Sequence, residues 1–192
     1  MRTFIRSLMV LSVAAPLAAQ SAQQGAPQGP PPPPVVPAAG EIAPDFTLPW
    51  ADAKGPRAEP VTLSKLRGQV VVLAFYPADF SRGCTIEMSK FRDEYKTLFG
   101  DGVTVMPISR DSIKMHARWA DTMAFQFPLV SDTAGTVAKL YGSQGRQPTS
   151  GFARTVFVVG KDGKIVWSSA RFNAAAQIGY DSLTAAVAAA KK

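Results

Sequence analysis

A single cysteine and a single histidine occur among the 192 residues, and this scarcity excludes several kinds of chemistry. One cysteine cannot form an intramolecular disulfide or a Cys-x-x-Cys redox pair, nor supply a zinc site that needs two or more cysteines. With His116 as the only histidine, little room remains for a histidine-rich metal site or a hydrolase site of cysteine, histidine and asparagine. We therefore expect no metal site and no cofactor.

Long runs of one charge are also missing. Lys and Arg outnumber Asp and Glu by 21 to 14, which gives a net charge of +7, but the basic residues are scattered along the chain. A nucleic-acid-binding protein gathers its basic residues in one run or on one face. We therefore expect no nucleic-acid partner.

Residues 1–19 have the pattern of a secretory signal peptide. Two arginines precede an apolar run over residues 8–17, and two alanines follow it. The run is shorter than the about 20 residues that a membrane-spanning helix needs. We expect an exported protein, periplasmic or secreted, with no stable membrane insertion after cleavage; an uncleaved anchor is the alternative.

Residues 20–40 are rich in glutamine and proline and include the run Pro30 to Pro34. Such a segment cannot bury a core, so we expect a disordered, extended linker. A ligand for an aromatic groove is the alternative interpretation. The folded domain is then expected over residues 41–192.

From residue 41 onward, strand and helix patterns alternate. An unbroken apolar run over 70–76 predicts a central strand that is covered on both faces. Apolar residues at helical spacing predict a helix from near Cys84 to just before Gly100. Further strands are expected at 103–108, 127–130, 155–159 and 165–168, with a hairpin turn at 160–163 and poor pairing at Pro107. Further helices are expected at 113–123, 133–141 and from Asp181, the first of them capped by Asp111 or Ser112. This order indicates an α/β protein of thioredoxin-like fold, with a central mixed β-sheet flanked by helices.

Cys84 is the residue with nucleophilic potential, and it stands where the central strand gives way to a helix. The free N–H groups and partial positive charge of a helix N-terminus favour a thiolate over a thiol. Ser81 can hydrogen-bond to the sulfur or to an oxygen beside it, and Gly83 lets a substrate approach the backbone. The alternative is a small buried hydrophobic residue without chemistry.

The spacing Pro77-x-x-x-Ser81-x-x-Cys84 resembles the active-site signature of the peroxiredoxins, Pro-x-x-x-(Thr/Ser)-x-x-Cys. The likeness covers nearly all of residues 41–167 and is greatest to the bacterioferritin-comigratory-protein, or peroxiredoxin Q, branch of the AhpC/TSA superfamily. Further segments that carry it are 43–49, 61–68, 109–112 with His116, 127–132 and 151–159.

This resemblance implies a thiol-dependent peroxidase that reduces hydrogen peroxide and organic hydroperoxides through a sulfenic acid on Cys84. By position, Ser81 would hold the peroxide oxygens, and Arg154 would stabilise the thiolate and the leaving oxygen. Pro77 would shield the sulfur from water, and backbone N–H groups at Gly83 would supply further donors. We expect the sulfur at the mouth of an accessible cavity.

The chain departs from this branch at Ser89, where many members carry a resolving cysteine. The cycle is therefore expected to use one cysteine and an external thiol reductant, either a thioredoxin-like protein or a small thiol. The protein is expected to be a monomer or a homodimer. Glu87 matches a commonly acidic position and is treated as a supporting residue.

Four other residues near the motif have ordinary structural interpretations. Arg82 is expected in solvent, His116 on a helix surface or in packing, and Trp119 and Phe80 in the core or at the pocket rim.

Three other functions remain open alternatives. An exported thioredoxin-like thiol–disulfide oxidoreductase would need a second cysteine, usually at the position of Glu87. A copper-handling protein would need two cysteines and a histidine, and a catalytically silent module would need none of Ser81, Cys84 and Arg154.

Overall fold

The computed structural model describes residues 36–147 and 150–192, so the predictions for residues 1–19 and 20–35 lie outside the described residues. Residues 36–40 lie against the domain. Val36 packs on a core cluster, and the Gly40 N–H donates to the Ile165 carbonyl at 2.8 Å. Within the described ranges, no helix combines the length and apolar character needed to cross a bilayer.

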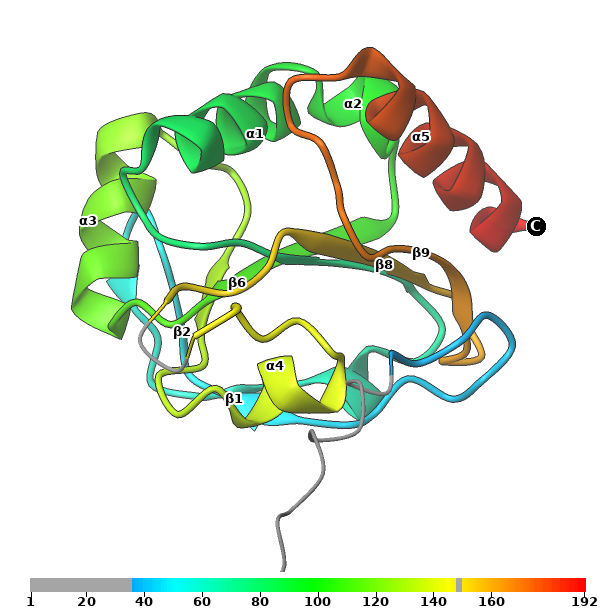
Figure 1. The fold of residues 1–192 in the computed structure, drawn as a ribbon, viewed down its shortest axis with the longest axis horizontal. Coiled ribbons are helices and arrows are strands. Elements are labelled where there is room, and N and C mark those ends of the chain that lie inside the picture. The colour runs from blue at the N-terminus through cyan, green and yellow to red at the C-terminus, as the bar shows by residue number, and fades with distance from the viewer. Residues whose placement is uncertain (1–35, 148–149) are drawn as a thin grey trace, which may run out of the picture. The chain divides into compact units, whose positions relative to one another are not determined.

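Seven strands form one mixed sheet in the order β3-β2-β7-β6-β5-β8-β9 (Figure 1). The strand β5 is parallel to β6 and antiparallel to β8. The bounds are β2 (Trp50–Asp52), β3 (Gly55–Pro56), β5 (Val70–Phe75), β6 (Val103–Ser109), β7 (Leu129–Ser131), β8 (Thr155–Val159) and β9 (Ile165–Ser169), and a separate pair is formed by β1 (Thr47–Leu48) and β4 (Val61–Thr62). The predicted α/β architecture, a central mixed sheet flanked by helices, is confirmed.

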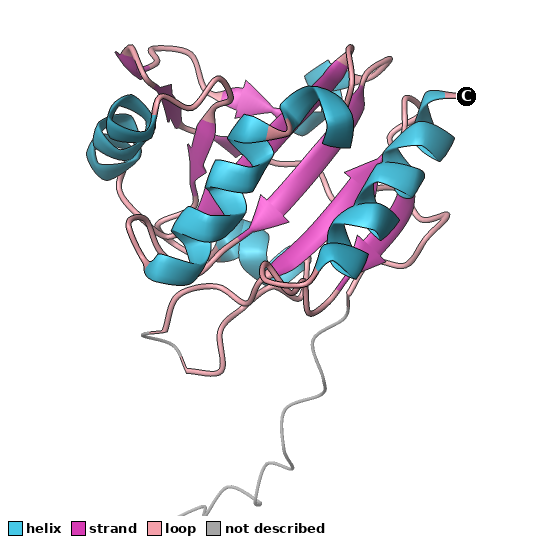
Figure 2. Ribbon diagram, turned by 90° about the horizontal axis from the view of Figure 1, so that it is seen from above, coloured by secondary structure: helices cyan, strands magenta, loops and turns pink. Residues whose placement is uncertain are grey.

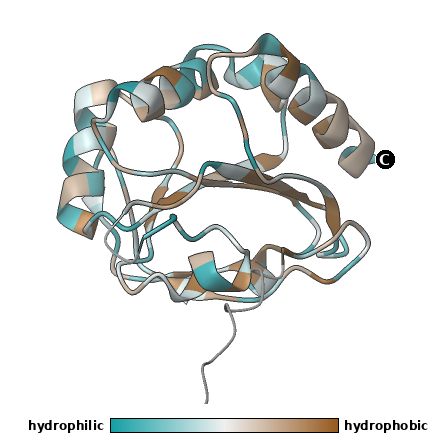
Figure 3. Ribbon diagram, viewed as in Figure 1, coloured by the Kyte–Doolittle hydropathy of each residue, from teal (hydrophilic) through white to brown (hydrophobic). Residues whose placement is uncertain are grey.

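The sheet is covered on both faces because β5 alternates its side chains between two hydrophobic clusters. Val70, Val72 and Ala74 join one cluster, whereas the three residues between and after them join the other. All six residues of β5 are buried, as the unbroken apolar run predicts. Figure 3 shows the resulting band of hydrophobic residues along the central strands.

Helices form the two outer layers. The helices α1 (Arg82–Asp93), α2 (Tyr95–Leu98) and α5 (Gln177–Lys191) lie over one face of the sheet (Figures 1 and 2). The short α4 (Thr136–Leu140) lies over the other face, where the 3₁₀ helix η1 (Leu63–Leu66) also packs its Leu63. The helix α3 (Ile113–Met123) lies beside β2 and β7.

Two helix predictions need correction. The helix expected from Cys84 to before Gly100 is interrupted at Glu94, whose φ of −108° and ψ of 22° leave the helical range. The final helix begins at Gln177, four residues before the expected Asp181. Ser112 caps α3 as predicted, because its side chain accepts from the Met115 N–H at 3.3 Å.

The expectation that Pro107 pairs poorly is wrong, because Pro107 lies within β6 and stands opposite Ala74. The Ile108 carbonyl accepts from the Tyr76 N–H, so Ile108 faces β5 and Pro107 faces the β7 side. Pairing with β7 begins only opposite Ile108, so no N–H is needed at Pro107. The predicted hairpin between β8 and β9 is present, with Gly163 at a φ of 77°.

Candidate active site

Cys84 is placed by the junction between β5 and α1. The loop that follows β5 ends at Ser81, the residue preceding the first turn of α1, so Cys84 is the third residue of the helix. The helix thus begins two residues earlier than predicted. The amides of a first helical turn have no carbonyl four residues back within the helix, so the N–H groups of Gly83 and Cys84 are available to a ligand.

The sulfur is not at the mouth of a cavity as expected. Cys84 is fully buried and belongs to the core cluster that contains Tyr76 and Met88. The reason is helical periodicity, because Cys84, Met88 and Phe91 lie on the one stripe of α1 that packs on the sheet. A peroxide can therefore reach the sulfur only if the residues that cover it move.

Arg154 reaches this buried sulfur from the neighbouring strand. It directly precedes β8, and Thr155 pairs with Phe75 at the end of β5, which brings Arg154 beside the first turn of α1. Its Nη2 donates to the Cys84 Sγ at 3.3 Å, while its Nη1 donates to the Glu87 carboxylate. The guanidinium thus links the sulfur to an acidic side chain one turn further along the helix.

Burial governs the charges at this site. Burial raises the pKa of Glu87 to about 7, although the Arg154 charge and hydrogen bond oppose this shift. For Arg154, burial acts to lower the pKa, but the charges of Glu87 and Cys84 outweigh it and hold the pKa above its ordinary value. The side chain of Glu87 is 0% exposed and that of Arg154 18%, so the cost of lost hydration falls mainly on the carboxylate. The Glu87 Oε1 has no hydrogen-bond partner among the described residues.

The other predicted residues lie around the sulfur in different roles. The Ser81 hydroxyl donates to the Ala78 carbonyl at 3.0 Å, and no hydrogen bond joins it to Cys84 within the described part of the chain. A Cβ on Gly83 would stand 3.1 Å from Arg154 Nη2, so glycine keeps this approach open.

A groove of about 1020 Å³ runs past the covered sulfur. Pro77, Gly83 and Arg154 line it, so three of the five predicted site residues form its wall, whereas Ser81 and Cys84 do not. Its other lining residues include apolar ones such as Ile86 and Phe152, basic ones such as Arg146 and Arg171, and the polar Gln144, Ser150 and Asn173.

Two residues that line the groove, Pro77 and Gly151, approach each other closely through their backbones. A Cβ added to Gly151 would overlap the carbonyl of Pro77, so the chain before β8 packs directly on the loop before α1. Glycine at position 151 therefore fixes how closely these two segments approach.

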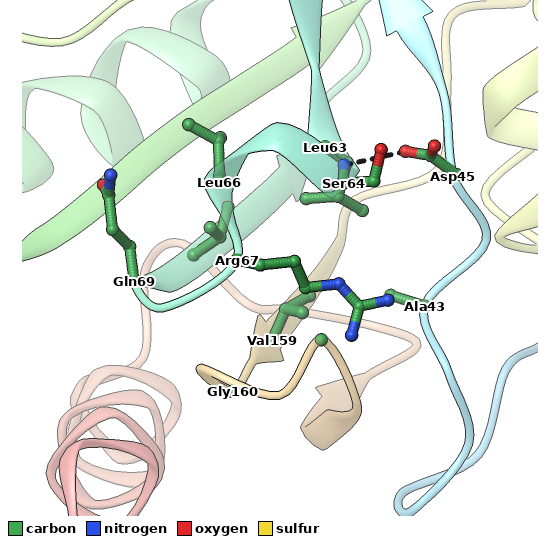
Figure 4. Close-up of a pocket in the computed structure, with 11 residues that line it drawn as sticks. Ala43, Asp45, Leu63, Ser64, Leu66, Arg67, Gln69, Val159 and Gly160 are labelled. Carbon is green, nitrogen blue, oxygen red and sulfur yellow. Dashed lines mark hydrogen bonds between the residues drawn. The ribbon is translucent and has the colours of Figure 1, made fainter.

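A second, much smaller cavity of about 20 Å³ lies elsewhere, between Ser64, Arg67 and Gly160 (Figure 4). Asp45 accepts from the Ser64 N–H at 2.8 Å, and the Arg67 guanidinium donates to the Asp162 carbonyl. This cavity has room for about one water molecule. It shares no lining residue with the groove, and we assign it a structural role in joining these segments.

The remaining residues singled out in the sequence follow their expected packing roles. Arg82 is exposed, Trp119 is fully buried, and Phe80 is 44% exposed with its ring 5.8 Å from that of Trp119. His116 is a packing residue and not a surface one, since it is fully buried. In the described ranges, no three His, Cys, Asp or Glu side chains are grouped to hold a metal ion.

Comparisons with known proteins identify chains that are similar to this one. Residues 39–168 match the AhpC/TSA family. Peroxiredoxin Bcp of Escherichia coli K12 is 35% identical over 132 residues, which cover 66% of this chain and 81% of that protein.

Two solved structures share the fold. Peroxidoxin BcpB of Mycobacterium tuberculosis matches with a TM-score of 0.68 and 32% identity, covering 80% of this chain and 97% of the other. The bacterioferritin comigratory protein of Xanthomonas campestris, described for alkyl peroxide reduction, matches with a TM-score of 0.65 and 27% identity, covering 76% and 92%. These matches confirm the predicted thioredoxin-like fold.

Proposed function

This chain belongs to the AhpC/TSA family and is a thiol-dependent peroxidase, and from that premise we propose that Cys84 is its peroxidatic residue in a one-cysteine cycle. The observation that carries this proposal is the hydrogen bond from Arg154 to the Cys84 sulfur at the first turn of α1. A cationic donor and a helix N-terminus both stabilise the thiolate, which is the reactive form of cysteine.

In the first step, the Cys84 thiolate attacks the terminal oxygen of a hydroperoxide. An S–O bond forms, the O–O bond breaks, and the departing alkoxide or hydroxide takes up a proton to leave as alcohol or water. Arg154, which contacts the sulfur, and the amides of Gly83 and Cys84 in the first turn of α1 would stabilise the negative charge that develops on the departing oxygen. While the Ser81 hydroxyl donates to the Ala78 carbonyl, it can still accept from the peroxide O–H, and it must turn only to donate to a peroxide oxygen.

In the second step, an external thiol attacks the sulfenic acid on Cys84. A mixed disulfide forms and water leaves, and a second thiol then releases the reduced cysteine together with a disulfide. The sequence supports this route because Cys84 is its one cysteine, so no internal disulfide can form. The reductant is a thioredoxin-like protein or a small thiol.

The groove supports organic hydroperoxides as substrates beside hydrogen peroxide. It offers about 1020 Å³ and apolar contacts from Ile86 and Phe152, enough to receive an organic tail. The related Xanthomonas protein, described for alkyl peroxide reduction, is consistent with this substrate class.

Peroxide consumption with dithiothreitol as reductant tests the proposed cycle. We expect turnover of hydrogen peroxide and of an organic hydroperoxide by the natural chain, none by Cys84→Ser, and an oxidised monomer that gains one oxygen and no internal disulfide. Equal consumption by both proteins would contradict the assignment of Cys84.

We further propose that the protein is exported to the periplasm or secreted, on the basis of the signal pattern in residues 1–19. Cell fractionation and N-terminal sequencing of the mature chain test this, and a cytoplasmic chain with its first residues intact would refute it. Light scattering after size-exclusion chromatography distinguishes the expected monomer or homodimer from larger assemblies.

A further inference from the structure

Beneath the loop that precedes Cys84 lies a buried polar cluster that the peroxidase cycle does not use. It consists of Tyr76, Asp79 and His116, and the side chains of Asp79 and His116 are only 1% and 0% exposed. Asp79 belongs to the loop itself, whereas His116 comes from α3 and Tyr76 follows β5. Two segments that are distant in the sequence, the β5–α1 connection and α3, therefore meet at one buried carboxylate.

The hydrogen bonds fix where the protons lie. His116 Nε2 is 3.2 Å from the Val130 carbonyl, which can only accept, so Nε2 carries a proton. His116 Nδ1 is 2.8 Å from Asp79 Oδ2, and the Tyr76 hydroxyl lies 2.6 Å from Asp79 Oδ1. Burial, followed by the charge of Asp79, raises the pKa of Tyr76 well above its ordinary value, so the hydroxyl keeps its proton and donates it.

The pair of Asp79 and His116 therefore holds a proton between Oδ2 and Nδ1, because two lone pairs would otherwise face each other across 2.8 Å. The other titratable groups around it are Tyr76, after β5, and Asp111, after β6. The strand β7 contributes the Val130 carbonyl. A buried charge without a partner is costly, so each member of this pair depends on the other.

The same loop is held in an unusual backbone conformation directly after Asp79. Phe80 has a φ of 57°, in the left-handed region that non-glycine residues rarely adopt. The Asp79 N–H donates to the Asp111 carboxylate at 2.9 Å, so both the backbone and the side chain of Asp79 are anchored. Such a conformation persists only where the surroundings over-determine it.

We propose that His116 is a positioning residue for the peroxidase reaction, acting through Asp79 to hold the loop of residues 77–81 that leads into α1 and Cys84. This inference rests on the proposed function. The anchored Asp79 stands two residues before Ser81, and the same loop carries Pro77 and leads directly into Gly83 in the first turn of α1. Its placement therefore sets where the peroxide oxygens meet the first turn of α1.

The proposal has a consequence that a general loss of stability would not produce. The sulfur is fully buried and follows this loop within the first turn of α1, so we expect a loosened loop to admit reagents while it misplaces the groups that activate a peroxide. In His116→Gln, an amide replaces the ring and cannot donate to both Asp79 and Val130 in the same geometry. We expect the rate constant for hydrogen peroxide to fall about 10- to 100-fold, because small displacements at a reacting centre cost that much. Alkylation of Cys84 by iodoacetamide is expected to stay equal or become faster.

The experiment measures both second-order rate constants on the reduced full chain, at a temperature where circular dichroism shows every variant folded. Met123→Ala is the matched control, since Met123 lies on the same helix and packs on the core. It should lower the unfolding temperature and leave the ratio of the two rate constants unchanged. The double variant Asp79→Asn/His116→Gln replaces the carboxyl group and the imidazole with two amides and is expected to recover part of the lost ratio.

An unchanged ratio in folded His116→Gln would overturn the proposal, as would an equal fall in Met123→Ala. If His116→Gln does not fold, Asp79→Asn is measured in its place with the same expectation and the same refuting result. A natural chain that fails to react with peroxide would instead refute the proposed function, because that result does not involve His116.

Discussion

Replacing Glu87 with glutamine should change how the stability of the protein depends on pH. Glu87 is fully buried, its Oε2 accepts from Arg154, and its Oε1 has no partner among the described residues. A glutamine side chain at this position would keep the shape and one acceptor oxygen but could not ionise. The substitution therefore isolates the cost of the buried carboxylate charge.

The size of the effect follows from the shift in pKa, which burial raises from an ordinary value of 4.5 to about 7. A carboxyl whose pKa is raised in the folded state contributes stability below its unfolded pKa and loses that contribution as pH rises through the folded pKa. The whole shift corresponds to on the order of 3 kcal/mol. For a domain of this size, that energy moves the unfolding temperature by about 6–12 °C.

Thermal unfolding followed by circular dichroism from pH 5 to pH 8.5 measures this effect. We expect Glu87→Gln and the natural chain to unfold at similar temperatures near pH 5, and the variant to become the more stable one above pH 7. Glu94→Gln is the control on the same helix, because its exposed carboxylate pairs with Lys90 and should change stability by less than about 1 kcal/mol at any pH. A gap between Glu87→Gln and the natural chain that stays constant across this range would refute the reasoning.

Three further substitutions test other parts of the structure. Arg154→Lys should lower the second-order rate constant for hydrogen peroxide by about 100-fold in stopped-flow measurements, because one ammonium cannot reproduce the two directed contacts to Cys84 and Glu87; an undiminished rate would exclude the guanidinium from catalysis. Gly151→Ala should destabilise the fold by about 1–3 kcal/mol in urea unfolding, because the new methyl group overlaps the Pro77 carbonyl; a neutral result would mean that the two loops separate freely. Ser112→Ala should cost about 1 kcal/mol through loss of the cap on the Met115 N–H, without changing peroxide reactivity.

The sequence predicts the strands of the sheet well because their signal is local. The apolar runs over residues 70–76 and within 155–159 predict buried strands from their composition alone, and both strands are buried in the structure. The short strands β1 to β4 carry no such signal, because two or three residues cannot establish a period. Their pairing depends on neighbours that are distant in the sequence.

The burial of Glu87 and His116 could have been predicted from helical spacing, although both are polar residue types that are usually exposed. Glu87 follows Cys84 by three residues and precedes Met88, so helical spacing already places it on the buried stripe of α1. On α3, the buried Trp119 and Ala120 follow His116 by three and four residues, so helical spacing places His116 on the buried face as well. Their partners, Arg154 and Asp79, come from other elements, and no local pattern could pair them.

Charge balance explains why a buried acid belongs beside a reactive sulfur. One guanidinium, Arg154, faces both Cys84 and Glu87, and it can balance one full negative charge in a buried site. Burial raises the pKa of Glu87 to about 7, so near neutral pH about half of it is protonated, and the charge of Arg154 is then available to the thiolate that the proposed cycle requires. When Cys84 becomes a neutral sulfenic acid, the same guanidinium can balance an ionised Glu87. The pair therefore keeps the site near zero net charge in both states of the sulfur, which a permanently ionised or permanently neutral partner of Arg154 would not do.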